Sequence, residues 1–259
     1  MRAIILAAGR GERMRPLTDT TPKPLLLVQG KPLIVWHIEA LAAAGVRDIV
    51  VNTAWLSEQF PATLGDGSRY GVRLHYSDES LEPGGALETA GGIRKALPLL
   101  LEDGDSSFWV ASADVFVPGF RFEPEAAARF AADPALDGQL WMVANSPHHP
   151  GGDFVIDAEG MAQSERHGAA PEQARLTWSC LGLFKARLFA HLPLGQALRL
   201  RHCLHNVAVL NIEQRHYRRQ DGHQQGNDTV QPIGSPFSLV DHVFNRILDV
   251  SHSKTLSQQ

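Results

Sequence analysis

The chain has 259 residues, of which 44% are hydrophobic and 20% are charged. This balance is that of a folded globular protein with a sizeable core, in one large domain or two small ones. The net charge of −4 at pH 7 gives no electrostatic reason to expect nucleic acid or an anionic membrane as a partner.

The first element along the chain is an apolar run at residues 3–8, which charged residues end within the stretch 9–13. The run is shorter than the roughly 7–15 apolar residues of a secretory signal or the about 20 of a membrane span, so we expect a buried strand. Two cysteines, Cys180 and Cys203, form neither a disulfide framework nor a zinc cluster, and this usage is typical of the reducing cytosol. We therefore expect a cytoplasmic protein.

Helix-like and strand-like segments alternate after this run. Residues 32–44 have the composition of a helix, with Pro32 at its start and Gly45 as its C-cap. The other elements expected before residue 114 are strands at 48–52, 72–76 and 107–111 and helices at 56–64 and 89–101. Those expected after it are a helix at 124–132 and strands at 138–143, 154–156 and 177–184. The alternation predicts an α/β fold with a Rossmann-like, doubly wound, mostly parallel (mixed) sheet.

The most informative segment is the loop after the first strand, LAAGRGERMRPLT, followed by TPKPL. Its two glycines let the backbone come close to a ligand, and successive N–H groups in such a turn form a concave anion site. Arg13, Arg15 and Lys23 add cationic groups that can neutralise a triphosphate. A lone G-x-G after a strand is often only a turn, and this loop lacks both the third glycine of a dinucleotide fingerprint and the G-K-[ST] ending of a P-loop.

With arginine and lysine at these offsets, the loop resembles the signature of the sugar-1-phosphate nucleotidyltransferases. The resemblance implies that Arg13 and Lys23 are catalytic. It also implies that the loop binds the nucleotide through Leu6, Ala7, Ala8, Gly9, Gly11, Glu12 and Arg13. The stretch LETAGGI at 87–93 is similar to the family's second nucleotide loop, which assigns Glu88 and Thr89 to the base. Its alternative interpretation is an ordinary helix N-terminus with Thr89 as the cap.

The strand at 107–111 leads to Asp114, which matches the position of the family's metal-binding aspartate. A carboxylate at the carboxyl end of a parallel strand lies where open α/β sheets bind ligands. Mg²⁺ prefers such hard oxygen ligands together with substrate phosphates. The resemblance thus implies a Mg²⁺ cofactor held by Asp114, with Ser112 among the nucleotide-binding residues.

Within the family, several stretches resemble the N-acetylmuramate-1-phosphate uridylyltransferases; they are AWL at 54–56, LGDGS at 64–68, ALPLL at 96–100 and NSPHHPGGDF at 145–154. This resemblance implies UTP and N-acetylmuramate 1-phosphate as substrates, and a sugar side lined by Asp153, Glu165 and Thr177. His148 and His149 are expected in a polar surface turn. The alternatives are another nucleotide and sugar pair, such as GTP with mannose 1-phosphate or a glucose-1-phosphate enzyme, and a catalytically weakened nucleotide-binding homologue. A monomer and a dimer are both compatible with the sequence.

The chain departs from the family pattern at three places. It has Ser112-Ala113-Asp114 where an N-G-D triplet is usual, and Cys180 where the related strand commonly has glycine. The second metal-binding aspartate near the C-terminus is not found, since the nearest match to its segment has Pro232 in its place. The residues that could replace it are Asp221, Asp228 and Asp241.

The composition changes near residue 198. Six of the twelve histidines follow this point, and the stretch 218–231 has almost no apolar residues. We therefore expect a nucleotidyltransferase domain at 1–197, with a nucleotide half at 1–114 and a sugar-side half at 115–197. Residues 198–259 are expected to form a divergent C-terminal segment.

Overall fold

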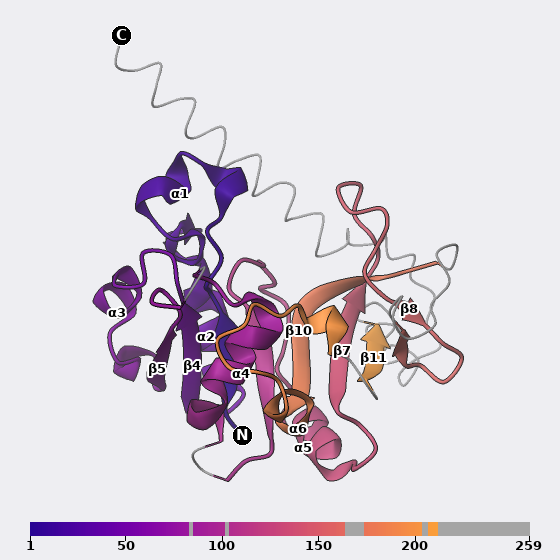
Figure 1. The fold of residues 1–259 in the computed structure, drawn as a ribbon. Coiled ribbons are helices and arrows are strands. Elements are labelled where there is room, and N and C mark those ends of the chain that lie inside the picture. Colours follow the sequence, from indigo (N-terminus) through magenta and orange to yellow (C-terminus); the bar gives the residue numbers. More distant parts are fainter. Residues whose placement is uncertain (83–84, 102–103, 164–173, 204–206, 212–259) are drawn as a thin grey trace, which may run out of the picture.

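A seven-stranded sheet forms the centre of the protein, with strand order β11-β7-β10-β6-β1-β4-β5 (Figure 1). The computed structural model describes residues 1–82, 85–101, 104–163, 174–203 and 207–211. The strands of the sheet are β1 (Ala3–Leu6), β4 (Asp48–Thr53), β5 (Arg73–Asp78), β6 (Ser107–Ser112), β7 (Gly138–Val143), β10 (Thr177–Lys185) and β11 (Val207–Asn211). Only β10 is antiparallel to its neighbours among these strands, so the mostly parallel, mixed sheet expected from the sequence is confirmed.

Helices cover both faces of the sheet because successive residues of its strands are apolar and their side chains point to opposite faces. Ile5 of β1 belongs to one hydrophobic core, and the neighbouring Ile4 belongs to the other. The core around Ile5 is covered by α2 (Leu33–Ala43), α3 (Gln59–Leu64) and α5 (Pro124–Ala132). The core around Ile4 is covered by α4 (Glu88–Leu100) and α6 (Arg187–Ala190). The fold is therefore doubly wound.

Short elements complete the described chain. The hairpins are β2 (Leu27–Val28) with β3 (Lys31–Pro32), and β8 (Val155–Ile156) with β9 (Ala162–Gln163). The single-turn helices are α1 (Leu17–Thr20), η1 (Glu12–Met14), η2 (Lys23–Leu25), η3 (Ser68–Tyr70) and η5 (Leu200–His202). The segment around α1 projects beyond one end of the sheet (Figure 1). Within the described part of the chain, every helix falls short of the length and apolar character that crossing a membrane requires.

The order of β5, β4, β1 and β6 positions the candidate site. From β1 the chain moves outward to β4 and β5, and then returns through α4 to β6 on the other side of β1. The loops that follow β1 and β6 therefore start side by side, at the carboxyl ends of two adjacent parallel strands, and lead towards opposite edges of the sheet. This switch point is where open α/β sheets form a ligand-binding crevice.

Element boundaries differ from the expected ones where backbone geometry intervenes. The strand expected at 3–8 ends at Leu6, and the Ala7 N–H that follows donates to both the Oδ1 atom of Asn52 at 2.8 Å and the backbone carbonyl of Asn52 at 3.2 Å. The helix expected from residue 56 begins at Gln59, because Leu56 has a left-handed φ of 49°. The alternative interpretation of Thr89 as a cap is wrong, because α4 already begins at Glu88.

Candidate functional site

The loop after β1 is held in a tight turn by Gly11. This residue has a φ of 65°, and an added Cβ would lie 2.9 Å from Cγ2 of Thr18 and 3.1 Å from Cβ of Lys23. The hydroxyl of Thr18 also donates to the carbonyl of Gly11 at 2.9 Å. Gly9 is different, because an added Cβ there would meet nothing within 4 Å. Gly11 thus shapes the turn, and Gly9 leaves its backbone open to a ligand.

Lys23 and Asp114 form an ion pair at the carboxyl ends of β1 and β6. The Nζ atom of Lys23 lies 3.0 Å from Oδ2 of Asp114, and the Ser112 hydroxyl donates to Oδ1 at 2.8 Å. Leu6 and Ser112 are register partners at the ends of β1 and β6, which brings the two loops together. The structure thereby unites Leu6, Gly11, Lys23, Ser112 and Asp114, which the sequence had assigned to one site.

The Asp114 carboxyl is ionised at neutral pH. Burial opposes ionisation, but the Lys23 ammonium and the Ser112 hydroxyl outweigh it and hold the pKa of Asp114 below its usual value. The side chain of Asp114 remains 45% exposed, whereas that of Lys23 is 18% exposed. The site therefore presents an accessible carboxylate beside a partly buried cation.

The remaining cationic groups of the first loop lie at the surface. Glu12 and Arg13 are exposed on η1. The guanidinium of Arg10 lies 5.5 Å from the ring centroid of Trp55, and Arg15 pairs with Asp19 at 3.2 Å. Arg13 is thus positioned on the same loop as Gly11, on the solvent side of the turn.

The N-terminus of α4 contacts a later segment of the same chain. The carbonyl of Leu198 accepts from the N–H groups of Ala90 at 2.8 Å and Gly91 at 3.3 Å. An added Cβ on Gly91 would lie 2.2 Å from the Gln196 carbonyl oxygen. Glu88, which has a φ of 59°, lies with one carboxylate oxygen 3.5 Å from Nε of Arg199. The small residues of this loop therefore accommodate residues 196–199, and base contact by Glu88 and Thr89 stays a prediction.

Two buried residues that the sequence interpretation missed lie beneath both loops. Asn52 accepts from the Ala7 N–H and donates to Oε1 of Glu79 at 2.7 Å. The other carboxylate oxygen of Glu79 accepts from the Leu87 N–H at 2.7 Å. A signal was present, because Asn52 ends a predicted strand and Glu79 follows the next one, as Asp114 follows a third. No motif marks them.

The expected sugar-side residues lie at the same edge of the sheet. β6 and β7 run in the same direction because each is antiparallel to β10. The hydroxyl of Thr177 donates to Oδ1 of Asn145 at 2.8 Å. Oδ2 of Asp153 accepts from the Trp178 N–H at 2.9 Å, and its Oδ1 lies 3.2 Å from Nε2 of His149. His149 lies in an exposed turn, as expected. Glu165 is outside the described residues.

Cys180 lies near both Asp114 of the expected metal site and Asp153 of the expected sugar side. It occupies an irregularity of β10, where the register with β7 shifts between Trp178 and Gly182, and its φ is 61°. Burial, followed by the nearby carboxylates of Asp114 and Asp153, raises the pKa of its thiol to about 12. This left-handed backbone is one that glycine adopts without steric cost. The thiol remains protonated at neutral pH.

Asp114 is the candidate metal ligand within the described residues, where no cluster of three or more His, Cys, Asp or Glu side chains is found. One accessible carboxylate, completed by substrate phosphates and water, matches the way Mg²⁺ is commonly held. The proposed replacements for a second ligand, Asp221, Asp228 and Asp241, lie outside the described residues, as does Pro232.

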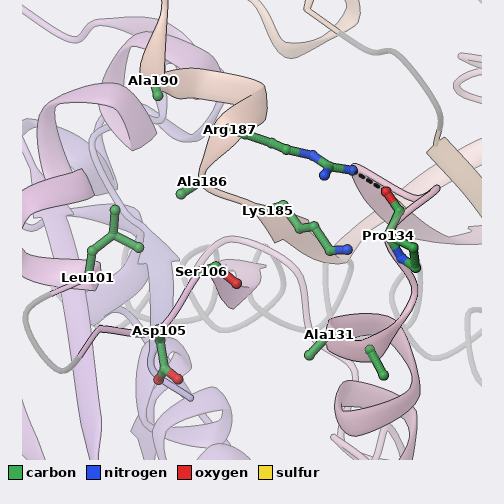
Figure 2. Close-up of a pocket in the computed structure, with 10 residues that line it drawn as sticks. Leu101, Asp105, Ser106, Ala131, Pro134, Lys185, Ala186, Arg187 and Ala190 are labelled. Carbon is green, nitrogen blue, oxygen red and sulfur yellow. Dashed lines mark hydrogen bonds between the residues drawn. The ribbon is translucent and has the colours of Figure 1, made fainter.

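A pocket of about 530 Å³ lies at the opposite end of the sheet (Figure 2). Its charged groups are engaged within the protein: Asp105 pairs with the N-terminal amine, Lys185 with the Asp133 carbonyl, and Arg187 with Asp137 and the Pro134 carbonyl. Its lining residues are separate from the candidate site at the carboxyl ends of β1 and β6.

Comparisons with known proteins show the family and the fold of the chain. The model of the nucleotidyl transferase family matches residues 2–165. N-acetylmuramate alpha-1-phosphate uridylyltransferase from Neisseria meningitidis serogroup B is 46% identical over 200 residues, which are 77% of this chain and 82% of that protein. Mannose-1-phosphate guanyltransferase from Gibberella zeae is 42% identical over 124 residues, 48% of this chain and 32% of that protein. The crystal structure of HddC from Yersinia pseudotuberculosis complexed with GMP-PN has the same fold, with a TM-score of 0.64 and 18% identity over 82% of this chain and 90% of that one.

Proposed function

Because the chain belongs to the nucleotidyl transferase family, we propose that it transfers uridine monophosphate from UTP to N-acetylmuramate 1-phosphate and releases pyrophosphate. The observation that carries this proposal is the 46% identity to a uridylyltransferase of that sugar over 200 residues. An aligned stretch of that length extends beyond the 114 residues of the nucleotide half, so the sugar side contributes to the similarity.

The reaction is a substitution at the α-phosphorus of the nucleotide. An oxygen of the sugar phosphate forms the new P–O bond, and the bond from the α-phosphorus to the pyrophosphate oxygen breaks. The attacking oxygen is already an anion, so no protein base has to activate it. The protein must instead bring two polyanions together and stabilise the charge that develops in line.

Lys23 and Arg13 would supply the positive charge for this step. Lys23 lies beside Asp114 at the carboxyl ends of β1 and β6, which suits contact with the α-phosphate or the incoming sugar phosphate. Arg13 is exposed on η1 and would hold the β and γ phosphates. The open backbone at Gly9 leaves room for the nucleotide against the main chain.

Mg²⁺ is part of the proposal, with Asp114 as its protein ligand. The ionised, accessible carboxylate fits a hard divalent cation. When bound, the metal would link the phosphates and screen their mutual repulsion. Lys23 now pairs with the same carboxylate, so metal and ammonium would share the charge of Asp114.

The remaining assignments are proposals of the same kind. The nucleotide would be bound by Leu6, Ala7, Ala8, Gly9, Gly11, Glu12, Glu88, Thr89 and Ser112. Asp153 and Thr177 would contact the sugar, together with Glu165. We also propose a nucleotidyltransferase domain at 1–197 and a divergent segment after it, of which β11 extends the sheet beside β7.

A second candidate keeps the reaction and changes the substrates to GTP and mannose 1-phosphate. The observation in its favour is the 42% identity to a mannose-1-phosphate guanyltransferase. That similarity spans about half of the chain, so it speaks for the nucleotide half more than for the sugar. A catalytically weakened homologue is the third possibility, because a second metal-binding aspartate was not found in the sequence.

One assay separates the three candidates. Pyrophosphate release is measured with UTP or GTP against N-acetylmuramate, mannose and glucose 1-phosphates, with Mg²⁺ present or chelated. We expect turnover with UTP and N-acetylmuramate 1-phosphate that is lost on chelation. Preference for GTP and mannose 1-phosphate would replace the proposal with the second candidate, and UTP binding without turnover on any sugar would favour the weakened homologue.

A further inference from the structure

A chain of three buried hydrogen bonds connects the starts of the two nucleotide loops. It runs from the Ala7 N–H to Asn52 at 2.8 Å, from Asn52 to Glu79 at 2.7 Å, and from Glu79 to the Leu87 N–H at 2.7 Å. Asn52 is 2% exposed and Glu79 is 0% exposed. We call Asn52 and Glu79 the buried pair. Ala7 opens the first loop, and Leu87 immediately precedes α4, so the pair contacts both at their points of departure.

The direction of each hydrogen bond follows from the chemistry of the groups. The backbone N–H groups of Ala7 and Leu87 can only donate. The amide oxygen of Asn52 faces Ala7, so its NH₂ group faces Glu79, and both carboxylate oxygens of Glu79 then accept. Every donor has an acceptor when Glu79 is ionised. Exchanging amide and carboxylate at one residue alone therefore leaves two donors or two acceptors facing each other: two NH₂ groups in Glu79→Gln, and two carboxylates in Asn52→Asp.

The surrounding structure leaves little room for the buried pair to move. An added Cβ on Gly92 of α4 would lie 2.6 Å from Oε1 of Glu79 and 2.7 Å from Nδ2 of Asn52. The Glu79 N–H donates to the Thr53 carbonyl at 2.7 Å. The pair is therefore wedged between α4 and the ends of β4 and β5.

A buried carboxylate is an expensive way to fill a core, because taking it out of water costs more than burying an apolar side chain of similar volume. This free-energy cost is understandable if nucleotide binding depends on the relative position of the two loops. We infer that Asn52 and Glu79 are positioning residues that set the distance between the first loop and the N-terminus of α4, and thereby the affinity for the nucleotide. This inference rests on the proposed function of the two loops.

The inference predicts that a change in the buried pair affects the binding of the two substrates differently. Neither residue of the pair can reach a ligand, since both are buried beneath the loops. The expected sugar-side residues Asp153 and Thr177 are hydrogen-bonded to other groups, namely Trp178, His149 and Asn145. Loosening the pair should therefore weaken nucleotide binding and leave the KM for the sugar 1-phosphate nearly unchanged.

The test uses the full chain and exchanges the donor and acceptor roles within the pair. In Glu79→Gln, the side-chain oxygen can still accept from Leu87, but its NH₂ group faces the NH₂ group of Asn52. Losing one hydrogen bond to a charged group should raise the Kd and KM for UTP roughly tenfold or more. In the double variant Asn52→Asp with Glu79→Gln, the carboxylate at 52 accepts from Ala7 and from the amide at 79. All three hydrogen bonds are restored, and UTP affinity should return to within about threefold of the original.

Glu82→Gln is the matched control, because it makes the same chemical change in the same loop at a residue that pairs with Lys95 outside the buried pair. UTP affinity is measured by calorimetry, both KM values and kcat by steady-state kinetics, and folding by thermal unfolding. An unchanged UTP affinity in Glu79→Gln, or an equal rise in both KM values, would overturn the inference. If the single variant does not fold, the double variant decides: restored folding and UTP affinity support the pair, and failure of both refutes it. Calorimetric UTP binding needs no turnover, so a chain that binds UTP without using any sugar 1-phosphate would refute the proposed function alone.

Discussion

The ammonium of Lys23 lies 3.0 Å from the carboxylate of Asp114, although the two residues are 91 positions apart in the chain. The side chain of Asp114 is 45% exposed, and a solvent-screened ion pair of this kind contributes only about 0–1 kcal/mol to the free energy of unfolding. Its importance lies in its position at the carboxyl ends of β1 and β6, where the order in which the chain adds strands to the sheet reverses. The pair places a cation and a carboxylate where a triphosphate and its metal would have to be held.

Replacing Lys23 with alanine should therefore reduce catalysis and leave folding nearly intact. We expect kcat to fall on the order of 10²–10³-fold, the usual loss when a preorganised charge is removed from the transition state. The matched control is Lys31→Ala, which removes a lysine that pairs with Glu39 on the surface. The measurement is pyrophosphate release at saturating substrates, with Tm recorded for each variant. Near-normal turnover in Lys23→Ala would refute its catalytic role.

Cys180 offers a test of backbone strain beside the site. Its φ of 61° is unfavourable for a residue with a side chain, and more so for a β-branched one. Cys180→Gly should leave the free energy of unfolding within about 1 kcal/mol of the original, because relief of strain offsets the greater freedom of the unfolded chain. Cys180→Val should lower it by about 1–3 kcal/mol. Urea unfolding of the two variants measures the difference, and equal stabilities would show that the left-handed conformation does not constrain this position.

Gly91→Ala should destabilise the protein, which is the reverse of the usual effect in a helix. Replacing glycine with alanine inside a helix normally stabilises it by about 1 kcal/mol. Here the new Cβ would lie 2.2 Å from the Gln196 carbonyl oxygen and would push residues 196–199 away from α4. We expect a net loss of about 1–3 kcal/mol in chemical unfolding. Gly119→Ala is the control, because its Cβ would meet nothing within 4 Å. A stabilised Gly91→Ala variant would contradict the packing of this segment on α4.

The ion pair of Asp48 with Arg73 should make stability depend on pH in the acid range. Hydrogen bonds from the Arg73 guanidinium, at 2.8 Å to each carboxylate oxygen, are the main reason that the pKa of Asp48 is lowered to about 2. A lowered folded-state pKa stabilises the protein above the unfolded value of 3.8, and this stabilisation is lost as the pH falls towards about 2.

Asp48→Asn should therefore cost about 1–2 kcal/mol at pH 7, less than the full shift because Arg73 is exposed and solvent screens the pair. The difference from the original protein should shrink below about pH 4. Urea unfolding at several pH values measures it, with the exposed Glu125→Gln as control. A difference that persists unchanged to pH 3 would rule out ionisation as its source.

The sequence predicted the order of strands and helices well because the local signals agree with the fold. Alternating apolar runs, Pro32 before α2 and Gly45 after it each favour the observed element independently. The residues of the first loop and Asp114 could be assigned because they stand in a recognisable pattern beside predicted strand ends. Their direct contact through Lys23 could not be read from the sequence, since it depends on β1 and β6 being neighbours.

The missed features are those that depend on packing between distant segments. Asn52 and Glu79 look like ordinary polar residues at strand ends, and only the approach of α4 buries them together. The contact of Leu198 with the start of α4 joins residues more than a hundred positions apart. The left-handed conformation of Cys180 arises from the register shift of β10 against β7. None of these leaves a periodic pattern in the sequence.

The most direct test of the proposed function follows the α-phosphorus itself. The protein is incubated with Mg²⁺, N-acetylmuramate 1-phosphate and UTP that carries a radiolabel on the α-phosphate, and the products are separated. We predict that the label appears in a uridine diphosphate sugar, that unlabelled pyrophosphate is released in equal amount, and that Lys23→Ala forms little of either. Label that remains in UTP, or that leaves only as free nucleotide, would contradict the proposed transfer.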